Sequence, residues 1–150
     1  MEGVSVEKVA KKLQLNSYMD HMDLKKFRIK LPDVNRPALQ LSGYFEHFEQ
    51  SRVQIIGMVE YTYLEHLELK EREEIYRQFL HYDIPCVIFC RDLKPDELFL
   101  QIAKENNVPI LGTGRSTSEF MAELIYTLSE QLAPCITIHG VLVDVYGEGL

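Results

Sequence analysis

A glycine-rich segment, Gly112-Thr113-Gly114-Arg115-Ser116-Thr117, contains the residue types best suited to binding a ligand. It lies between a short apolar run and a helical pattern, where backbone N–H groups can hold a phosphate and an arginine can add a charge-assisted hydrogen bond. The P-loop pattern G-x-x-x-x-G-K-[ST], with its lysine, is absent from this segment. The pattern favours a glycine turn that leads into a Ser/Thr helix cap. The alternative is a regulatory anion site formed by Gly112, Gly114, Arg115, Ser116 and Thr117.

His139 is the second candidate. It lies among apolar residues and precedes Gly140, whose missing side chain lets another backbone or a ligand come close. Two roles are open from the residues alone: a hydrogen-bonded core histidine or a catalytic one. The other histidines lack zinc-ligand spacing to cysteine or carboxylate, so no metal site is expected. No serine lies in a nucleophile-elbow pattern, and no catalytic triad is evident.

The cysteines are expected to be packed core thiols. Cys86 and Cys90 fall in a β-branched and aromatic run at residues 84–90, which predicts a buried strand. Four positions apart on a strand, they share a face and lie about 13 Å apart, too far for a disulfide or a shared metal ion. Cys135 stands alone in the sequence.

Composition excludes several classes of protein. The length of 150 residues suits one domain with a real core, and 46% hydrophobic with 26% charged residues is ordinary for a globular protein. A net charge of −7 argues against a nucleic-acid surface. No apolar run approaches the roughly 20 residues of a membrane span, and the first residues lack the pattern of a signal peptide. We therefore expect a cytoplasmic protein with no nucleic-acid or membrane partner.

Helices and strands are expected to alternate along the first part of the chain. Ser5 can cap a first helix whose apolar face contains Val6 and Val9, and Arg36-Pro37 opens a second helix that extends to Phe48. Further helices are predicted at residues 61–67 and 70–82. Strands are predicted at residues 27–31, 53–59 and 84–90.

The second part is more regular. A helix begins at Pro95-Asp96-Glu97 and ends at Asn106-Asn107, and a short strand follows at residues 108–111. Ser116 and Glu119 form a capping-box pattern at the start of a long amphipathic helix. Alternating strands and helices of this size predict a single α/β domain with a mainly parallel sheet and helices on both faces.

The pattern of the last fifteen residues allows a separate prediction. Residues 136–146 alternate like a strand, Gly147-Glu148-Gly149 offers a turn, and Leu150 resembles the first residue of a returning strand. The pattern predicts a fragment. Residues 1–133 would form an N-terminal α/β domain, and residues 134–150 would begin a second, C-terminal domain.

Three segments resemble one family. The string from His139 to Gly149, HGVLVDVYGEG, is similar to the segment before the P-loop of bacterial HPr kinase/phosphorylase. NRPALQLSGYF at residues 35–45 and QIIGMVE at residues 54–60 resemble the same family, in the same order and spacing. The resemblance covers nearly the whole chain, and the first string is its most specific part.

This resemblance implies a bifunctional enzyme. Members phosphorylate a serine of the phosphocarrier HPr with ATP and Mg²⁺ and reverse the reaction by phosphorolysis, which regulates carbon catabolite repression. The resemblance implies a hexamer, a Mur-ligase-like N-terminal domain and a C-terminal P-loop kinase domain that would start at residue 134. His139 resembles the active-site histidine, and its partners would lie beyond Leu150. We therefore expect this chain to be a regulatory or assembly domain, inactive alone and without its own cofactor.

A second hypothesis is a free-standing α/β module that senses a small anionic metabolite at residues 112–117. Its C-terminus would distinguish it, because a self-contained sensor should end after a completed element.

Overall fold

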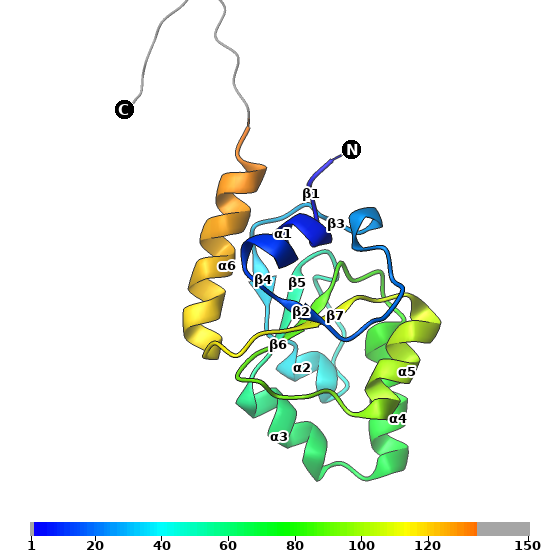
Figure 1. The fold of residues 1–150 in the computed structure, drawn as a ribbon. Helices are drawn as coiled ribbons and strands as arrows, with labels where there is room; N and C mark the ends of the chain where they lie inside the picture. Colours follow the sequence, from blue (N-terminus) through cyan, green and yellow to red (C-terminus); the bar gives the residue numbers. More distant parts are fainter. Residues whose placement is uncertain (1, 135–150) are drawn as a thin grey trace, which may run out of the picture.

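A five-stranded sheet forms the centre of residues 2–134, the part of the chain that the computed structural model describes (Figure 1). Its strand order is β2-β7-β6-β5-β4. The neighbouring strands from β4 to β7 are parallel, whereas β2 at the edge is antiparallel to β7. The strands are β4 (Val34–Asn35), β5 (Val53–Ile56), β6 (Val87–Phe89), β7 (Ile110–Gly112) and β2 (Asn16–Ser17). The predicted mainly parallel sheet is confirmed.

Helices cover both faces of this sheet, as predicted. On one face lie α1 (Val6–Lys12) and α6 (Thr117–Leu132), and on the other lie α2 (Ala38–Leu41), α3 (Met58–His66), α4 (Leu69–Leu80) and α5 (Glu97–Asn106) (Figure 1). Each face of the sheet has its own hydrophobic core. Strand β6 contributes side chains to both cores because successive residues point to opposite faces. Ile88 packs with α1 and α6, and Val87 and Phe89 pack with α2–α5. None of the helices described within residues 2–134 is long and apolar enough to cross a membrane.

A second, smaller sheet lies near the N-terminus. Strand β1 (Val4–Ser5) pairs antiparallel with β3 (Arg28–Ile29), and the 3₁₀ turn η1 (Leu24–Lys26) precedes β3. The strand predicted at residues 27–31 therefore exists only as two residues, outside the main sheet.

Local capping signals set the starts of three helices. The Ser5 hydroxyl accepts a hydrogen bond from the Lys8 N–H at 3.0 Å, and the Asp96 carboxylate accepts one from the Phe99 N–H at 2.7 Å. Ser116 caps α6 in the same way and also donates its hydroxyl to the Glu119 carboxylate at 2.7 Å. These N-caps satisfy N–H groups that have no partner inside the helix. Asp96 is the cap of α5, so Pro95 lies before the helix and not in its first turn.

The prediction of one helix from residue 36 to residue 48 is wrong. Helical structure is confined to α2, and Gly43 follows it with φ of +102°, a left-handed conformation that ends helices and suits glycine. The chain beyond this turn packs through its aromatic rings. Phe45 stacks on Tyr82 at a centroid distance of 5.4 Å, and Phe48 meets the same ring edge-on at 5.0 Å. This packing is long-range, so the helix-like spacing of these apolar residues in the sequence does not reveal it.

The strand predicted at residues 53–59 ends early. Strand β5 stops at Ile56, and Met58 and Val59 form the first turn of α3, with exposed fractions of 43% and 65%. The apolar run continues past the end of the strand, so hydrophobicity alone extends the prediction too far. The turn at Gly57 is set by Glu60, whose carboxylate accepts the Gly57 N–H at 2.8 Å.

Cys86 and Cys90 are free, buried and packed in the same core, as predicted, but they flank β6, which is shorter than the strand predicted at residues 84–90. Burial raises the pKa of the Cys86 thiol to about 12 and that of Cys90 to about 11, because a thiolate is poorly solvated there. A hydrogen bond with Thr117 partly offsets the rise at Cys90. Cys135 lies outside the described residues.

We expect Cys86 and Cys90 to resist alkylation in the folded protein. The thiolate is the nucleophile, and a pKa of about 12 or 11 leaves almost none of it at pH 8. Incubation with iodoacetamide followed by peptide mass spectrometry measures labelling at each cysteine. Labelling in 6 M guanidinium chloride is the control and should be complete at both sites. Labelling of either thiol in native buffer as fast as in the denatured chain would contradict the burial described above.

Candidate functional site

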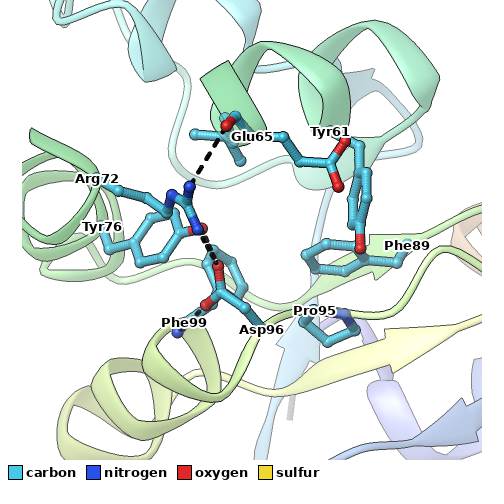
Figure 2. A pocket seen from close by; sticks show the side chains of 9 residues that line it. Tyr61, Glu65, Arg72, Tyr76, Phe89, Pro95, Asp96 and Phe99 are labelled. Atoms are coloured by element: carbon cyan, nitrogen blue, oxygen red, sulfur yellow. Dashed lines mark hydrogen bonds and ion pairs between the residues drawn. The ribbon is translucent and has the colours of Figure 1, made fainter. Parts of the chain in front are cut away.

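A small cavity of about 80 Å³ lies beyond the carboxyl end of β6, between α3, α4 and the first turn of α5 (Figure 2). We call it the aromatic pocket. Carboxyl ends of parallel strands are the usual place for ligand sites in α/β folds because the connecting loops converge there. The lining residues come from several separate elements: Tyr61, Leu64, Glu65, Arg72, Tyr76, Phe89, Pro95, Asp96 and Phe99.

Aromatic rings in edge-to-face contact form much of the pocket wall. Phe99 meets Tyr76 at a centroid distance of 4.9 Å and Phe89 at 5.3 Å, with interplanar angles of 89° and 79°. Tyr61 meets Phe89 at 6.3 Å and 89°. Each geometry is favourable, because the positive edge of one ring faces the negative face of the next. The rings therefore hold one another in place, and the pocket has a preformed wall.

Asp96 organises the polar side of the pocket. Besides capping α5, its carboxylate accepts the Tyr76 hydroxyl at 2.6 Å and lies 3.4 Å from the Arg72 guanidinium. Burial and this hydrogen bond raise the pKa of Tyr76 far above its ordinary value, since both favour the neutral phenol. The Tyr61 hydroxyl donates to the Lys94 carbonyl at 2.7 Å. Burial and the neighbouring charge of Glu65 raise the pKa of Tyr61 as well.

Arg72 closes the opposite side. Its Nη2 donates to the carbonyl of Leu67 at 3.0 Å and to that of Glu65 at 3.5 Å, at the C-terminal end of α3, where a cation is favourable. Its Nε is buried and has no hydrogen-bond partner among the described residues. The pocket offers rings, carboxylates and a guanidinium, and residues 2–134 contain no cluster of three metal-ligating side chains. These groups are suited to binding.

The predicted segment 112–117 lies elsewhere, at the carboxyl end of β7 and the start of α6. The Arg115 guanidinium donates through Nη1 to the Leu13 carbonyl at 2.8 Å, and its Nε lies 2.9 Å from the Glu123 carboxylate. The Ser116 hydroxyl is occupied by the helix cap, and Thr117 is buried. The segment therefore forms a turn leading into a capped helix, which is the interpretation that the sequence favours.

A carboxylate lies beside this turn. An ideal Cβ on Gly114 would come within 2.9 Å of Asp92 Oδ2, and the Asp92 N–H donates to the Thr113 carbonyl at 3.0 Å. An anion at residues 112–117 would have to compete with Glu123 for Arg115 and approach the charge of Asp92. The anion site stays a prediction. His139, the other predicted site residue, lies outside the described residues.

The aromatic pocket could not be found from local sequence patterns. Its rings are far apart in the chain and belong to four elements, so no motif joins them. One weak signal existed: Tyr61, Glu65, Arg72 and Tyr76 occur at helical spacing across two consecutive predicted helices. This spacing is equally compatible with ordinary packing.

An ion pair between a buried carboxylate and a partly exposed arginine lies at the neighbouring carboxyl end of β5. The Glu60 carboxylate, only 3% exposed, accepts Arg36 Nη2 at 2.7 Å as well as the Gly57 N–H. Gly57 fits beneath it without a side chain. An ideal Cβ there would lie 2.5 Å from Arg36 Nη2 and 2.7 Å from Thr117 Oγ1. This close packing requires glycine and joins the ends of β4, β5 and α6.

We expect Gly57→Ala to destabilise the domain by about 1–3 kcal/mol, because the new methyl group overpacks a filled site and alanine caps helices poorly. Gly114→Ala is the matched control. Its methyl group would meet only the end of the exposed Asp92 side chain, so the change should stay within about 0.5 kcal/mol. Urea unfolding of both variants gives the comparison. Equal stability of the two variants would contradict the packing at Gly57.

The raised pKa of Tyr76 predicts a loss of stability at alkaline pH. The unfolded phenol loses its proton near pH 10, whereas the folded one keeps it. The protonated Tyr76 phenol should therefore contribute fully to the free energy of unfolding below pH 10. Above pH 10 the free energy of unfolding should fall, by up to about 1.4 kcal/mol per pH unit. Tyr76→Phe should make the fall between pH 10 and pH 11 shallower. Tyr126→Phe, at an exposed site, should leave the slope unchanged, and equal slopes for all three proteins would refute the prediction.

Comparison with known proteins identifies relatives of similar sequence. An HPr kinase/phosphorylase of Lachnoclostridium phytofermentans is 45% identical over 150 residues, which is 100% of this chain and 48% of that protein. One from Caldicellulosiruptor bescii is 42% identical over 146 residues, 97% of this chain and 47% of that protein. One from Latilactobacillus sakei is 36% identical over 149 residues, 99% of this chain and 48% of its own length. The chain thus spans about half the length of these relatives.

A solved structure shares the fold. It contains the CBS and DRTGG domains of the regulatory region of a Clostridium perfringens pyrophosphatase, in complex with the activator diadenosine tetraphosphate. The superposition has a TM-score of 0.59 at 18% identity and covers 93% of this chain and 53% of that one. At this identity the likeness concerns the α/β fold alone.

A family model described as the HPr Serine kinase N terminus matches residues 4–128, nearly all of the region in which the sheet, its helices and the aromatic pocket are formed. The chain belongs to the HPr serine kinase N-terminal family.

Proposed function

We propose that this chain is the N-terminal regulatory or assembly domain of a bifunctional HPr kinase/phosphorylase. The observation that carries the proposal is the match of the whole chain to the first half of relatives of that name. The complete protein would phosphorylate a serine of HPr with ATP and Mg²⁺ and remove the phosphate by phosphorolysis, as a cytoplasmic hexamer that regulates carbon catabolite repression.

The proposed division places the domain boundary at residues 133 and 134. In support, α6 ends at Leu132, and Ala133 is its C-cap, so the first domain would finish with a completed helix. Residues 134–150 would begin the kinase domain, and His139 would be a catalytic residue whose partners follow Leu150. A P-loop beyond that point would bind the phosphates of ATP.

The domain would contribute no phosphoryl transfer of its own. Such transfer needs a cradle for the phosphates, a Mg²⁺ site and a residue that orients the nucleophile. The segment that most resembles a phosphate cradle, residues 112–117, has no lysine, and its Arg115 is bonded to Leu13 and Glu123. These contacts support a structural role for the turn.

We expect the purified 150-residue chain to transfer no detectable phosphate to HPr with ATP and Mg²⁺, at least about 10³-fold less than a full-length relative, because the transition state would lack its stabilising groups. Phosphorylated HPr is measured by intact-protein mass spectrometry. The full-length Lachnoclostridium protein, the relative described above, serves as the positive control under the same conditions. Transfer by the chain alone, above a no-enzyme blank, would overturn the proposed division of labour.

A further inference from the structure

We propose that the aromatic pocket binds the arginine side chain of a basic segment of a partner protein. Nothing in the proposed kinase function assigns a ligand to this pocket, and the proposal does not depend on that function. It rests on the size of the cavity, the charge at its rim and the rings in its wall.

Size excludes most other ligands. Pockets for small molecules and cofactors commonly measure about 300–1,000 Å³. The aromatic pocket, at about 80 Å³, can hold one planar group or the end of one side chain. Cavities of this kind at protein interfaces receive a single anchor residue, and arginine is among the residues that most often serve as anchors.

The charge at the rim selects a cation. Two carboxylates, Glu65 and Asp96, line the pocket against one guanidinium, Arg72. Asp96 is satisfied by Arg72, Tyr76 and the Phe99 N–H, so Arg72 is largely neutralised. The Glu65 side chain makes no hydrogen bond or ion pair with the described residues. In Figure 2 it extends across the top of the hollow toward Tyr61, while Arg72 lies on the opposite side.

The neighbouring surface strengthens this preference. Glu68 is exposed just before α4, the helix that carries Arg72 and Tyr76 of the pocket, and the whole chain has a net charge of −7. Surface charges of one sign raise the local concentration of an oppositely charged partner and speed its association. A basic segment would be attracted to this side of the domain before any side chain enters the cavity.

The rings favour a guanidinium over other cations. A cation over the face of tyrosine or phenylalanine gains cation–π energy, and the planar guanidinium can also stack on the ring and pair with a carboxylate through two hydrogen bonds. Tyr61 supplies a ring near the free carboxylate of Glu65, and its hydroxyl is fixed by the Lys94 carbonyl (Figure 2). A guest at this position would contact both groups at once.

The test uses two short peptides with the 150-residue chain. Acetyl-Gly-Arg-Gly-amide carries the guanidinium, and acetyl-Gly-citrulline-Gly-amide has nearly the same shape without the charge. Titration of the ¹⁵N-labelled chain at low salt should move the amide signals of Tyr61, Glu65 and Phe89. We expect the arginine peptide to bind at least about fivefold more tightly than the citrulline peptide, and its binding to weaken at 0.3 M salt.

Two variants locate the site. Glu65→Gln should weaken binding of the arginine peptide about threefold, because it removes the unpaired carboxylate. Glu74→Gln is the matched control: it removes another exposed charge that lines a different hollow, and binding should be unchanged. Both changes are at exposed positions, and the dispersion of the spectrum reports whether each variant is folded.

Three results would overturn the proposal. They are equal binding of the two peptides, equal effects of Glu65→Gln and Glu74→Gln, and signal changes located away from the pocket. Absence of binding by the arginine peptide at tens of millimolar would overturn it as well.

Discussion

The burial of polar groups at the carboxyl end of the sheet is the constraint on which this domain depends. Strands β5, β6 and β7 are buried on both faces, so the groups that follow them must find partners inside the protein. After β5, the Glu60 carboxylate provides such a partner by accepting hydrogen bonds from Arg36 and from the Gly57 N–H. Removal of one partner would leave a buried charge uncompensated, which costs far more than the net gain from the pair. The position of α3, and with it one wall of the aromatic pocket, follows from this arrangement.

The sequence predicts best where the structural cause is local. The starts of α1 and α6 were predicted, and that of α5 to within two residues, because each cap residue bonds to a backbone N–H three residues ahead. The buried strand β6 was predictable for a similar reason, since its β-branched and aromatic residues are contained in one short run, although the strand is shorter than predicted. The alternation of such elements was enough to predict an α/β domain with a mainly parallel sheet.

Prediction from the sequence fails where contacts between residues far apart in the chain determine the structure. Nothing near Phe45 and Phe48 indicates that they pack on Tyr82, and without that contact their spacing resembles a helix. Strands β2 and β4 have two residues each, too few for a period to be visible. The aromatic pocket belongs to the same class, because Tyr61, Phe89 and Phe99 meet only after the sheet has brought three elements together.

The path from this end of the domain to the rest of the chain runs through α6. This helix starts at the carboxyl end of the sheet, and its 16 residues extend about 24 Å before the chain continues. Its inner face is fully buried through Phe120, Leu124 and Leu128, which hold it against the same core as β5 and β6. Such packing resists gradual deformation, so the helix moves as a unit if it moves at all. Strand β5 contacts both α6 and α3, a wall of the aromatic pocket, so it is the element that connects a guest in the pocket to α6.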